Sequence, residues 1–225
     1  MTPVILLSDG YIANGSEAWR IPSMSDYPEI HPPVVTERPE GGFLPYVRDE
    51  KRLARSWALP GSPGCEHRLG GLEKQDCVGC LSHDPQNHQR MVELRAEKVA
   101  RVADFLPEQE VYGDRKGGEL LVVGWGGTFG QIRTAVDTMR AEGLGVSHCH
   151  FSQINPLPRG VEQIFSKFKR IVVCELNMGQ FANYLRMSLP QFGYLQYNKV
   201  QGQPFTVREL TEHFRTLLGD KGEGK

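Results

Sequence analysis

Hydrophobic and polar residues follow two alternating periods over roughly the last hundred residues, and together they predict a sheet covered by helices. Short apolar runs are typical of buried strands, and the segments between them carry apolar residues at every third or fourth position, as amphipathic helices do. The predicted strands are 120–123, 146–151, 171–174 and 194–197, and the predicted helices are 128–142, 161–168, 179–189 and one that begins after Thr206. This alternation predicts a parallel sheet with right-handed crossovers. We therefore expect residues 119–225 to form a three-layer α/β domain.

Turn and capping residues support these helix bounds. Gly143 is placed to end helix 128–142, and Thr206-Val207-Arg208-Glu209 has the spacing of a capping box. The faces that we expect to point inward include Phe129, Ile132, Val136 and Met139 in the first of these helices, and Val161, Ile164, Phe165 and Phe168 in the second.

The start of the chain has a different pattern. Val4–Leu7 is an apolar run typical of a fully buried strand in a parallel sheet. The region that follows supplies little to pair with it, because eight of the fifteen prolines lie between Pro22 and Pro63 and glycines are interspersed. Such a stretch is expected to be extended and irregular, and loops of this length are usually functional or form interface arms. We infer that strand and arm belong to a sheet whose other members are missing from this chain.

A helix is predicted from Asp84-Pro85, where an acidic N-cap precedes a proline at the first helical position. Its expected apolar stripe consists of Val92, Ala96, Val99, Val102, Ala103 and Leu106. Gln109–Gly118 is rich in charge and glycine, and we interpret it as a linker that marks the main domain boundary.

Composition narrows the class of protein. The chain has 225 residues, a net charge of −1 and 39% hydrophobic residues, which is typical of a soluble globular protein with one or two domains. It offers no basic stripe for nucleic acid, and we expect neither nucleic-acid nor membrane partners. The N-terminus has no positively charged leader, and five cysteines suit reduced thiols better than a disulfide framework. The expected compartment is the cytoplasm.

Four segments, in this order, carry a resemblance. They are Pro3–Glu17, Asn87–Met91 with Arg95–Val99, Asn155–Pro158 and Glu175–Gln180. Together they resemble the alpha subunit of 2-oxoacid:ferredoxin oxidoreductases, with the 2-oxoglutarate branch the most similar. The resemblance covers nearly the whole chain.

The resemblance implies an enzyme complex that uses thiamine diphosphate and Mg²⁺. Such a complex decarboxylates a 2-oxoacid oxidatively, passes electrons through [4Fe-4S] clusters to ferredoxin, and yields an acyl-CoA with CoA as cosubstrate; the cofactor supplies the electron sink. The implied partners are a thiamine-diphosphate-binding beta subunit and ferredoxin, in a dimer of heterodimers.

The resemblance also implies a domain assignment. Residues 1–20 would be the last strand and loop of an incomplete thiamine-pyrimidine-side domain, 21–118 an irregular connecting arm and helix, and 119–225 a transketolase C-terminal-like α/β domain. The family's pyrimidine-side glutamate and its substrate-carboxylate segment have no counterpart here. We therefore expect no catalytic residue and no cofactor bound by this chain alone, which would supply structural and interface parts and be inactive in isolation.

Several polar residues follow predicted strands, where parallel sheets place ligands and partners. Glu175, Asn177 and Gln180 come after strand 171–174, and the Asp9–Glu17 loop, with Asp9, Tyr11, Asn14 and Glu17, comes after Val4–Leu7. We interpret both groups as interface or active-site-mouth candidates. For Asn177 and Glu175 a structural role, as a helix cap or a loop hydrogen-bond partner, is the alternative.

Gly124–Gly130 joins a predicted strand to a helix and resembles a phosphate-binding turn, although its spacing departs from G-x-G-x-x-G. A tight turn with Thr128 capping the helix is the main interpretation. Gly126, Gly127 and Thr128 are the candidates for an anionic cosubstrate such as CoA.

Two further groups have metal-ligand side chains. One group could hold a metal ion that stabilises an adaptor module, and it consists of Cys65, His67, Cys77 and Cys80. Their spacing departs from paired C-x2-C motifs, and free thiols in an interface arm are the alternative. His148 and His150 share one strand face and could bind a metal or ligand, but such histidines are more often hydrogen-bonded wall residues. We assign no metal site, and the metal-stapled or assembly module remains the alternative function.

Overall fold

The structure is a computed structural model that describes residues 2–219, with the side chain of Tyr11 excepted. The chain forms two compact units. The arm unit runs up to Ile5 and from Glu17 to Phe105, and the α/β unit runs from Leu6 to Ser16 and from Leu106 onward.

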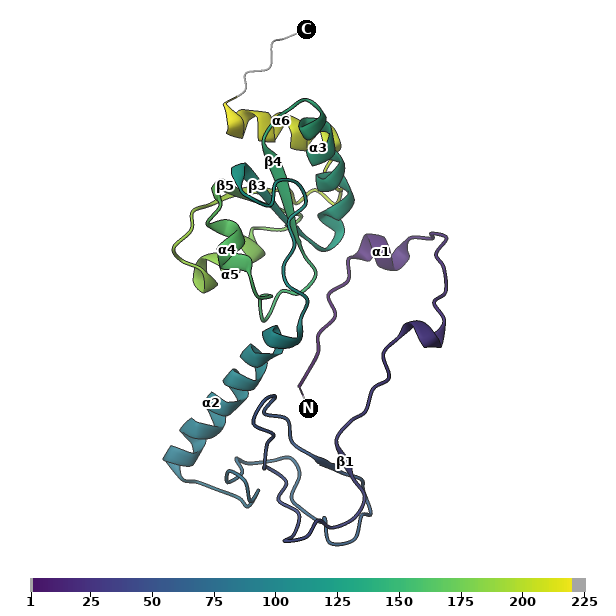
Figure 1. Ribbon diagram of the computed structural model, residues 1–225, viewed down its shortest axis with the longest axis vertical. Coiled ribbons are helices and arrows are strands. Elements are labelled where there is room, and N and C mark those ends of the chain that lie inside the picture. The colour runs from purple at the N-terminus through teal and green to yellow at the C-terminus, as the bar shows by residue number, and fades with distance from the viewer. Residues whose placement is uncertain (1, 220–225) are drawn as a thin grey trace. The chain divides into compact units, whose positions relative to one another are not determined.

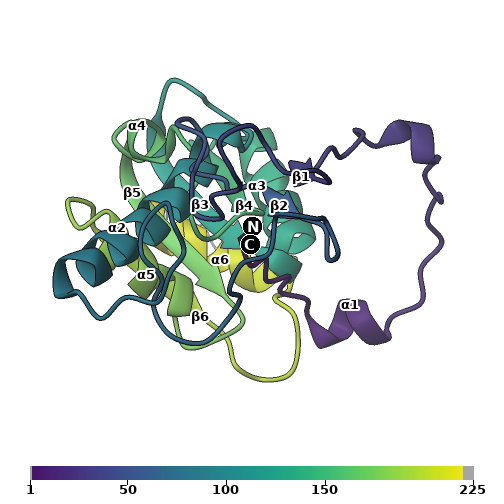
Figure 2. The same cartoon turned by 90° about the horizontal axis from the view of Figure 1, so that it is seen from below.

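The α/β unit is built on a four-stranded parallel sheet. Its strands are β3 (Gly118–Trp125), β4 (Val146–Phe151), β5 (Phe168–Glu175) and β6 (Tyr194–Asn198), in the order β4-β3-β5-β6. Helices α3 (Phe129–Ala141) and α6 (Val207–Leu218) cover one face, and α4 (Val161–Phe165) and α5 (Gln180–Ser188) cover the other (Figures 1 and 2). The predicted parallel α/β fold is confirmed.

The sheet separates two apolar cores, so its central strands are buried on both faces. Leu120–Val123 in β3 are fully buried, which is the pattern expected of a parallel sheet covered by helices. One core gathers Phe151, Phe165 and Phe181 under α4 and α5, and the other gathers Ile132 and Phe214 under α3 and α6.

Helix caps in this unit follow the sequence signals. The Thr206 hydroxyl accepts from Glu209 N at 3.2 Å, and a Glu209 carboxylate oxygen accepts from Thr206 N at 2.7 Å, which completes the predicted capping box. Gly143 follows α3 with φ of +82°, the left-handed conformation that glycine adopts without strain.

One inward position and one helix bound were predicted wrongly. Phe129 is 48% exposed, because it is the first residue of α3 and lies beside the rings of His148 and His150 instead of in the core. Phe168 is not helical: α4 ends at Phe165, and Phe168 opens β5 opposite Gly118 of β3.

The segment predicted as a linker packs on the edge strand of the sheet. Tyr112 N donates to His148 O, and His148 N donates to Tyr112 O, both at 2.8 Å. The Gln109 side chain donates to His150 O at 2.8 Å, and Val111 is buried. Residues 109–113 therefore belong to the α/β unit, and the compact units divide between Phe105 and Leu106 rather than at residue 118.

The arm unit is mostly irregular, as its proline content predicts. Its regular elements are η1 (Met24–Asp26), the two-residue parallel strands β1 (Val34–Val35) and β2 (Trp57–Ala58), helix α2 (Pro85–Arg101) and the 3-10 turn η2 (Val102–Phe105). Asp84 caps α2 as predicted, since its carboxylate accepts from Gln86 N at 3.2 Å and Asn87 N at 3.4 Å.

The buried face of α2 and the turn after it agrees only in part with the predicted stripe. Ala103 is buried, and Val99, Val102 and Leu106 are half-buried, but Val92 and Ala96 are exposed. Met91 is buried instead, with Leu94 and Lys98 half-buried on its face of the helix. The loop at 74–76 covers the face of α2 that carries Met91. It is held there by Asn87, one turn before Met91, whose side chain donates to Lys74 O and accepts from Asp76 N, each at 2.9 Å.

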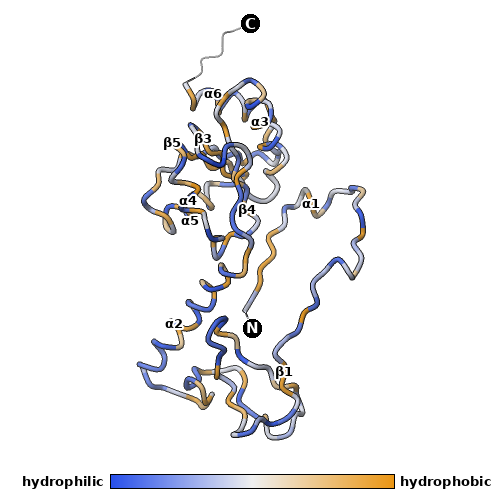
Figure 3. The backbone as a smooth tube through the Cα atoms, in the orientation of Figure 1, coloured by the Kyte–Doolittle hydropathy of each residue, from blue (hydrophilic) through white to orange (hydrophobic). Residues whose placement is uncertain are grey.

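The N-terminal segment is not a buried strand. Val4 is 91% exposed and Leu6 is 89% exposed, and no strand is assigned to Val4–Leu7, a hydrophobic stretch that Figure 3 colours orange. A strand needs a neighbouring backbone for its hydrogen bonds, and the described residues provide none here. The loop expected after it contains the short helix α1 (Gly10–Asn14). Between residues 2 and 219, no helix has the length and apolar character that crossing a lipid bilayer requires.

Candidate functional site

The site lies where β3 and β5 end side by side. These strands are neighbours in the sheet, with Val123 opposite Val173, so the loops that follow Trp125 and Glu175 leave the same edge. Loops at the carboxyl ends of parallel strands are where such sheets place ligands and partners.

Glu175 joins the two loops. Its side chain is fully buried, and its Oε1 accepts from the Trp125 indole N–H at 3.1 Å, across from the end of β3. The same oxygen accepts from the Asn177 side-chain amide at 3.1 Å. A buried carboxylate is tolerated when hydrogen bonds satisfy it, and here they come from both loops.

Glu175 and Asn177 also complete the N-terminus of α5. Glu175 accepts from Phe181 N at 2.8 Å and from Ala182 N at 3.0 Å, while Asn177 Oδ1 accepts from Gly179 N at 2.8 Å and from Gln180 N at 3.0 Å. These are amides that the helix itself leaves without partners. Within this chain both residues thus make the contacts of a helix cap and a loop hydrogen-bond partner, which was the structural alternative for them.

The glycine-rich turn after β3 is tight for a packing reason. A Cβ at Gly124 would lie 2.5 Å from Ile132 Cδ1 and 2.8 Å from Thr128 Oγ1, so any larger residue would force these side chains to shift. Gly126 and Gly127 are exposed, and Thr128 is buried at the N-cap position of α3. The predicted side-chain cap is wrong, because the Thr128 hydroxyl instead donates to Trp125 O at 2.9 Å.

The two loops line a pocket of about 550 Å³ together with residues from the N-terminal segment, and we call it the strand-end pocket. It gathers six of the predicted candidates: Asp9, Gly126, Gly127, Thr128, Asn177 and Gln180. Asp9 approaches the turn closely, since a Cβ at Gly127 would lie 3.9 Å from Asp9 Cβ. Its other walls are mainly apolar: Leu6, Leu7, Ile12, Trp125 and Leu176.

Asn14 and Glu17 do not line this pocket. The Asn14 side chain donates to Gly10 O at 2.9 Å within α1, and Glu17 belongs to the arm unit. The side chain of Tyr11 lies outside the described residues. Trp125 was not selected from the sequence, although a polar-tipped aromatic between two glycines at a strand end was a visible signal.

His148 and His150 are wall residues next to the edge of the sheet. Their ring centroids are 5.6 Å apart, and both rings lie beside Phe129. Burial lowers the pKa of His148 to about 3, with the nearby His150 and Arg133 adding to the effect, and burial lowers the pKa of His150 to about 4. Both are therefore neutral at physiological pH. His148 Nε2 and His150 Nδ1 have no hydrogen-bond partner, contrary to the usual wall histidine.

The cysteine and histidine set does not form a metal site. Cys65 is buried, Cys77 and Cys80 are exposed, and His67 Nδ1 lies 2.8 Å from Cys65 O. Within residues 2–219, no three His, Cys, Asp or Glu side chains are grouped so that they could hold a metal ion. The metal-stapled adaptor is thus unsupported, and these residues do not fit a [4Fe-4S] cluster or Mg²⁺.

Comparison with known proteins agrees with this geometry. Residues 118–210 match the family model of pyruvate:ferredoxin oxidoreductase core domain II. The chain is 40% identical over 98% of its length to 2-oxoglutarate oxidoreductase subunit KorA of Mycobacterium tuberculosis, and 28% identical over 93% of its length to the alpha subunit of 2-oxoacid:ferredoxin oxidoreductase 1 of Aeropyrum pernix. It covers 33% of each of these two proteins.

A solved structure matches as well. It is described as 2-oxoglutarate:ferredoxin oxidoreductase from Magnetococcus marinus with 2-oxoglutarate, coenzyme A and succinyl-CoA bound. The TM-score is 0.80 at 26% identity, over 88% of this chain and 34% of that one. This chain is therefore similar to the alpha subunits of 2-oxoacid:ferredoxin oxidoreductases, and it spans about one third of the length of the relatives that it matches.

Proposed function

We propose that this chain is part of the alpha subunit of a thiamine diphosphate-dependent 2-oxoglutarate:ferredoxin oxidoreductase. The complex would convert the 2-oxoacid to an acyl-CoA and pass the electrons to ferredoxin. The observation that carries the proposal is the 40% identity to the KorA subunit over 98% of the chain. The same fold in the 2-oxoglutarate:ferredoxin oxidoreductase of Magnetococcus marinus supports it.

We propose that the chain's own contribution is structural. No metal-holding group of three or more His, Cys, Asp or Glu occurs in residues 2–219, and the one carboxylate buried at the strand ends is committed to four hydrogen bonds. We propose that thiamine diphosphate, Mg²⁺ and the [4Fe-4S] clusters bind to other parts of the complex. The isolated chain is expected to be inactive.

The strand-end pocket is the proposed interface or active-site mouth. Leu6 and Ile12 line it and are 89% and 62% exposed, which leaves an apolar surface for a partner to cover. Gln180 is exposed at its rim, whereas Glu175 is fully buried and would act only by holding the loops in place.

The exposed glycines of the β3 turn remain the proposed contact for an anionic cosubstrate such as CoA. Gly126 and Gly127 let a ligand approach the backbone, and α3 begins there without a side-chain cap. The acidic Asp9 lines the same pocket, so an anion bound there would have to lie on the turn side, away from this carboxylate.

The proposed partners are a thiamine-diphosphate-binding beta subunit and ferredoxin, in a dimer of heterodimers. We propose the cytoplasm as the compartment, which is supported by five cysteines that are all free thiols.

The test is reduction of a viologen dye that depends on 2-oxoglutarate and CoA, in the presence of thiamine diphosphate and Mg²⁺. Three samples are compared: this chain, the other subunits of the complex, and the mixture. Pyruvate replaces 2-oxoglutarate in a parallel series to test the substrate branch.

Activity in the mixture alone would support the proposal. Full activity of the other subunits without this chain would refute the proposal that the chain is part of the enzyme. A silent mixture whose subunits are folded and co-purify would leave an assembly module, and the enzymatic role of this polypeptide would be rejected. If the mixture turned over pyruvate faster than 2-oxoglutarate, the proposed substrate would be wrong and the complex would belong to another branch of the family.

A further inference from the structure

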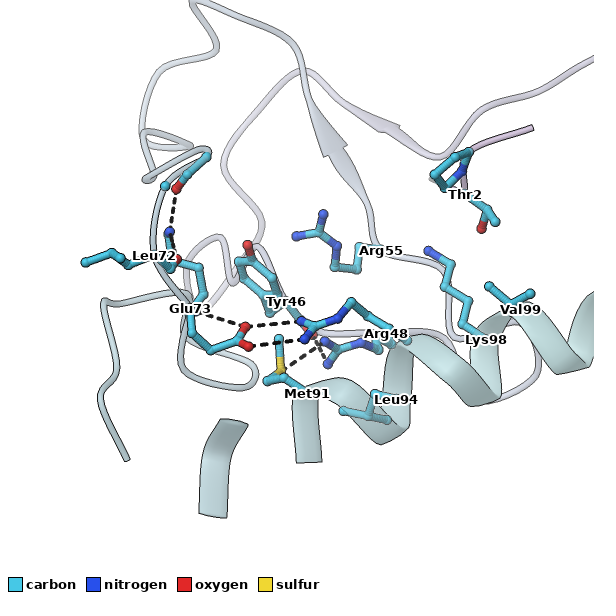
Figure 4. Close-up of a pocket in the computed structure, with 15 residues that line it drawn as sticks. Thr2, Tyr46, Arg48, Arg55, Leu72, Glu73, Met91, Leu94, Lys98 and Val99 are labelled. Carbon is cyan, nitrogen blue, oxygen red and sulfur yellow. Dashed lines mark hydrogen bonds and ion pairs between the residues drawn. The ribbon is translucent and has the colours of Figure 1, made fainter. Parts of the chain in front are cut away.

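The arm unit contains a second pocket, which plays no part in the proposed function. Its volume is about 630 Å³, and it lies between α2, the 70–74 loop and the segment around Tyr46 (Figure 4). We call it the arm pocket. Its charged lining is one-sided for a chain of net charge −1: it consists of Arg48, Arg55, Lys74, Arg95 and Lys98 against the single acid Glu73.

Arg95 and Lys74 are held by the loop at 70–74. Arg95 forms a fork to Glu73, with nitrogen to oxygen distances of 3.1 and 3.2 Å. The buried Lys74 ammonium donates to the carbonyls of Gly70 and Leu72 at 2.6 and 2.5 Å. These bonds shape the loop that forms one wall of the pocket.

Arg48, Arg55 and Lys98 line the rest of the pocket, and the Arg55 guanidinium donates to Pro45 O at 3.3 Å. The Arg55 guanidinium lies 4.2 Å from the centroid of the Tyr46 ring, and that of Arg48 lies 5.9 Å from the same centroid. Lys98 faces them from α2, as Figure 4 shows. Arg48 is fixed by Asp76 at 2.5 Å and by Tyr46 O at 2.8 Å, so its position is set before any ligand arrives.

The crowding of positive charge has an electrostatic cost. The pKa of Lys98 is lowered by burial first and by the charge of Arg55 next, with Arg48 contributing as well. Like charges held this close are stabilised by an anion between them, and a partly desolvated site strengthens that attraction.

Apolar side chains also line the arm pocket. They are the buried Met91 with Leu94 and Val99, all on α2, and Leu72 of the loop. A pocket of several hundred cubic ångströms with an apolar wall and a few fixed polar groups is typical of a small-molecule site. Its size favours a metabolite over a single inorganic ion.

We propose that the arm pocket binds a small molecule carrying a multivalent oxyanion, either a phosphate group or paired carboxylates, between Arg48, Arg55 and Lys98. The apolar remainder of the ligand would lie against Met91 and Leu94. This site is independent of the strand-end pocket and of the proposed enzyme activity.

The test is calorimetric titration of the full chain with two probes, pyrophosphate and citrate, which represent the phosphate and carboxylate sources. Binding is expected, and it should weaken as salt screens the charges. The variants R55Q and K98Q should each weaken binding by about tenfold or more, because each removes a charge-assisted contact. R68Q is the matched control, since Arg68 is exposed and does not line the pocket.

A second measurement works on the unmodified chain. The methyl resonance of Met91, assigned with a Met91→Leu variant, should shift on binding, because Met91 lines the pocket. Absence of binding by both probes at low salt would overturn the proposal. Equal binding by wild type, R55Q, K98Q and R68Q would do the same, as would a titration that leaves the Met91 methyl unmoved.

Discussion

Replacing Glu175 by glutamine separates the structural role of this carboxylate from a direct contact with a partner. The carboxylate is fully buried and accepts four hydrogen bonds, from Trp125, Asn177 and the amides of Phe181 and Ala182. If Glu175 mainly holds the strand-end loops, its loss must appear as lower stability in the isolated chain.

The magnitude follows from the individual bonds. In Glu175→Gln the amide oxygen can keep the Oε1 contacts, but its NH₂ then faces the Ala182 N–H, where Oε2 now accepts at 3.0 Å. Losing one charged acceptor costs about 1.5–3 kcal/mol, and the lost charge near the α5 N-terminus costs about 0.3–1 kcal/mol more. A buried glutamine is easier to desolvate than a carboxylate, which offsets part of this. We expect a net loss of about 2 kcal/mol in the free energy of unfolding.

Glu175→Ala should cost more, because all four donors lose their acceptor. At about 1–3 kcal/mol for each buried unsatisfied donor, with water entering the vacated space and satisfying some, we expect about 3–5 kcal/mol. A loss of this size is a large part of the stability of a typical domain.

The assay is urea denaturation followed by the fluorescence of Trp125. Trp19 and Trp57 are exposed residues of the arm unit, so they are first replaced by phenylalanine to leave a signal from the α/β unit alone. Glu110→Gln is the matched control, because Glu110 is an exposed acid of the same unit and its replacement should change stability by less than about 0.5 kcal/mol. If Glu175→Gln unfolds at the same urea concentration as Glu110→Gln, the hydrogen-bonding role of Glu175 is refuted.

Three further predictions follow from contacts in both units. The pKa of His148 is about 3 in the folded state, below the value of 6.5 in the unfolded chain. Because only the unfolded state takes up a proton as the pH falls below 6.5, the free energy of unfolding decreases from there down to about pH 3. At pH 5 the loss from this group should be about 2 kcal/mol, and His148→Leu should remove that part of the pH dependence in urea titrations. Gly124→Ala should destabilise the α/β unit by about 1–3 kcal/mol through overpacking against Ile132, whereas Gly130→Ala, with nothing within 4 Å of its added methyl, should be neutral or stabilising; equal melting temperatures would contradict this. Asp84→Ala should cost the arm unit about 1 kcal/mol while Asp84→Asn costs little, as measured by the loss of helical circular dichroism in urea.

The elements of the α/β unit could be predicted from the sequence because their signals are local. The strand at 146–151 and the Thr206 capping box depend on residues that are neighbours along the chain. Even the place of the site was predictable in part, since the ends of adjacent parallel strands must meet at one edge.

Features set by distant residues could not be predicted in this way. Helix α2 has two overlapping apolar registers, and the polar loop bound by Asn87 determines that Met91 rather than Val92 is buried. The Trp125 to Glu175 contact joins positions fifty residues apart, and no periodicity reports it. Val4–Leu7 has the composition of a buried strand, but its burial depends on a neighbour that the described residues do not supply.

The backbone pairing of Tyr112 with His148 has a consequence for self-association. β4 is an edge strand, and an open edge presents unpaired N–H and C=O groups to which a second molecule can add a strand. Residues 109–113 occupy that edge in the native chain. A version trimmed to start at Gly118, where the match to the family model begins, would lose this cover. We expect it to form dimers or larger species on gel filtration, whereas a version that starts at Leu106 should keep the edge closed.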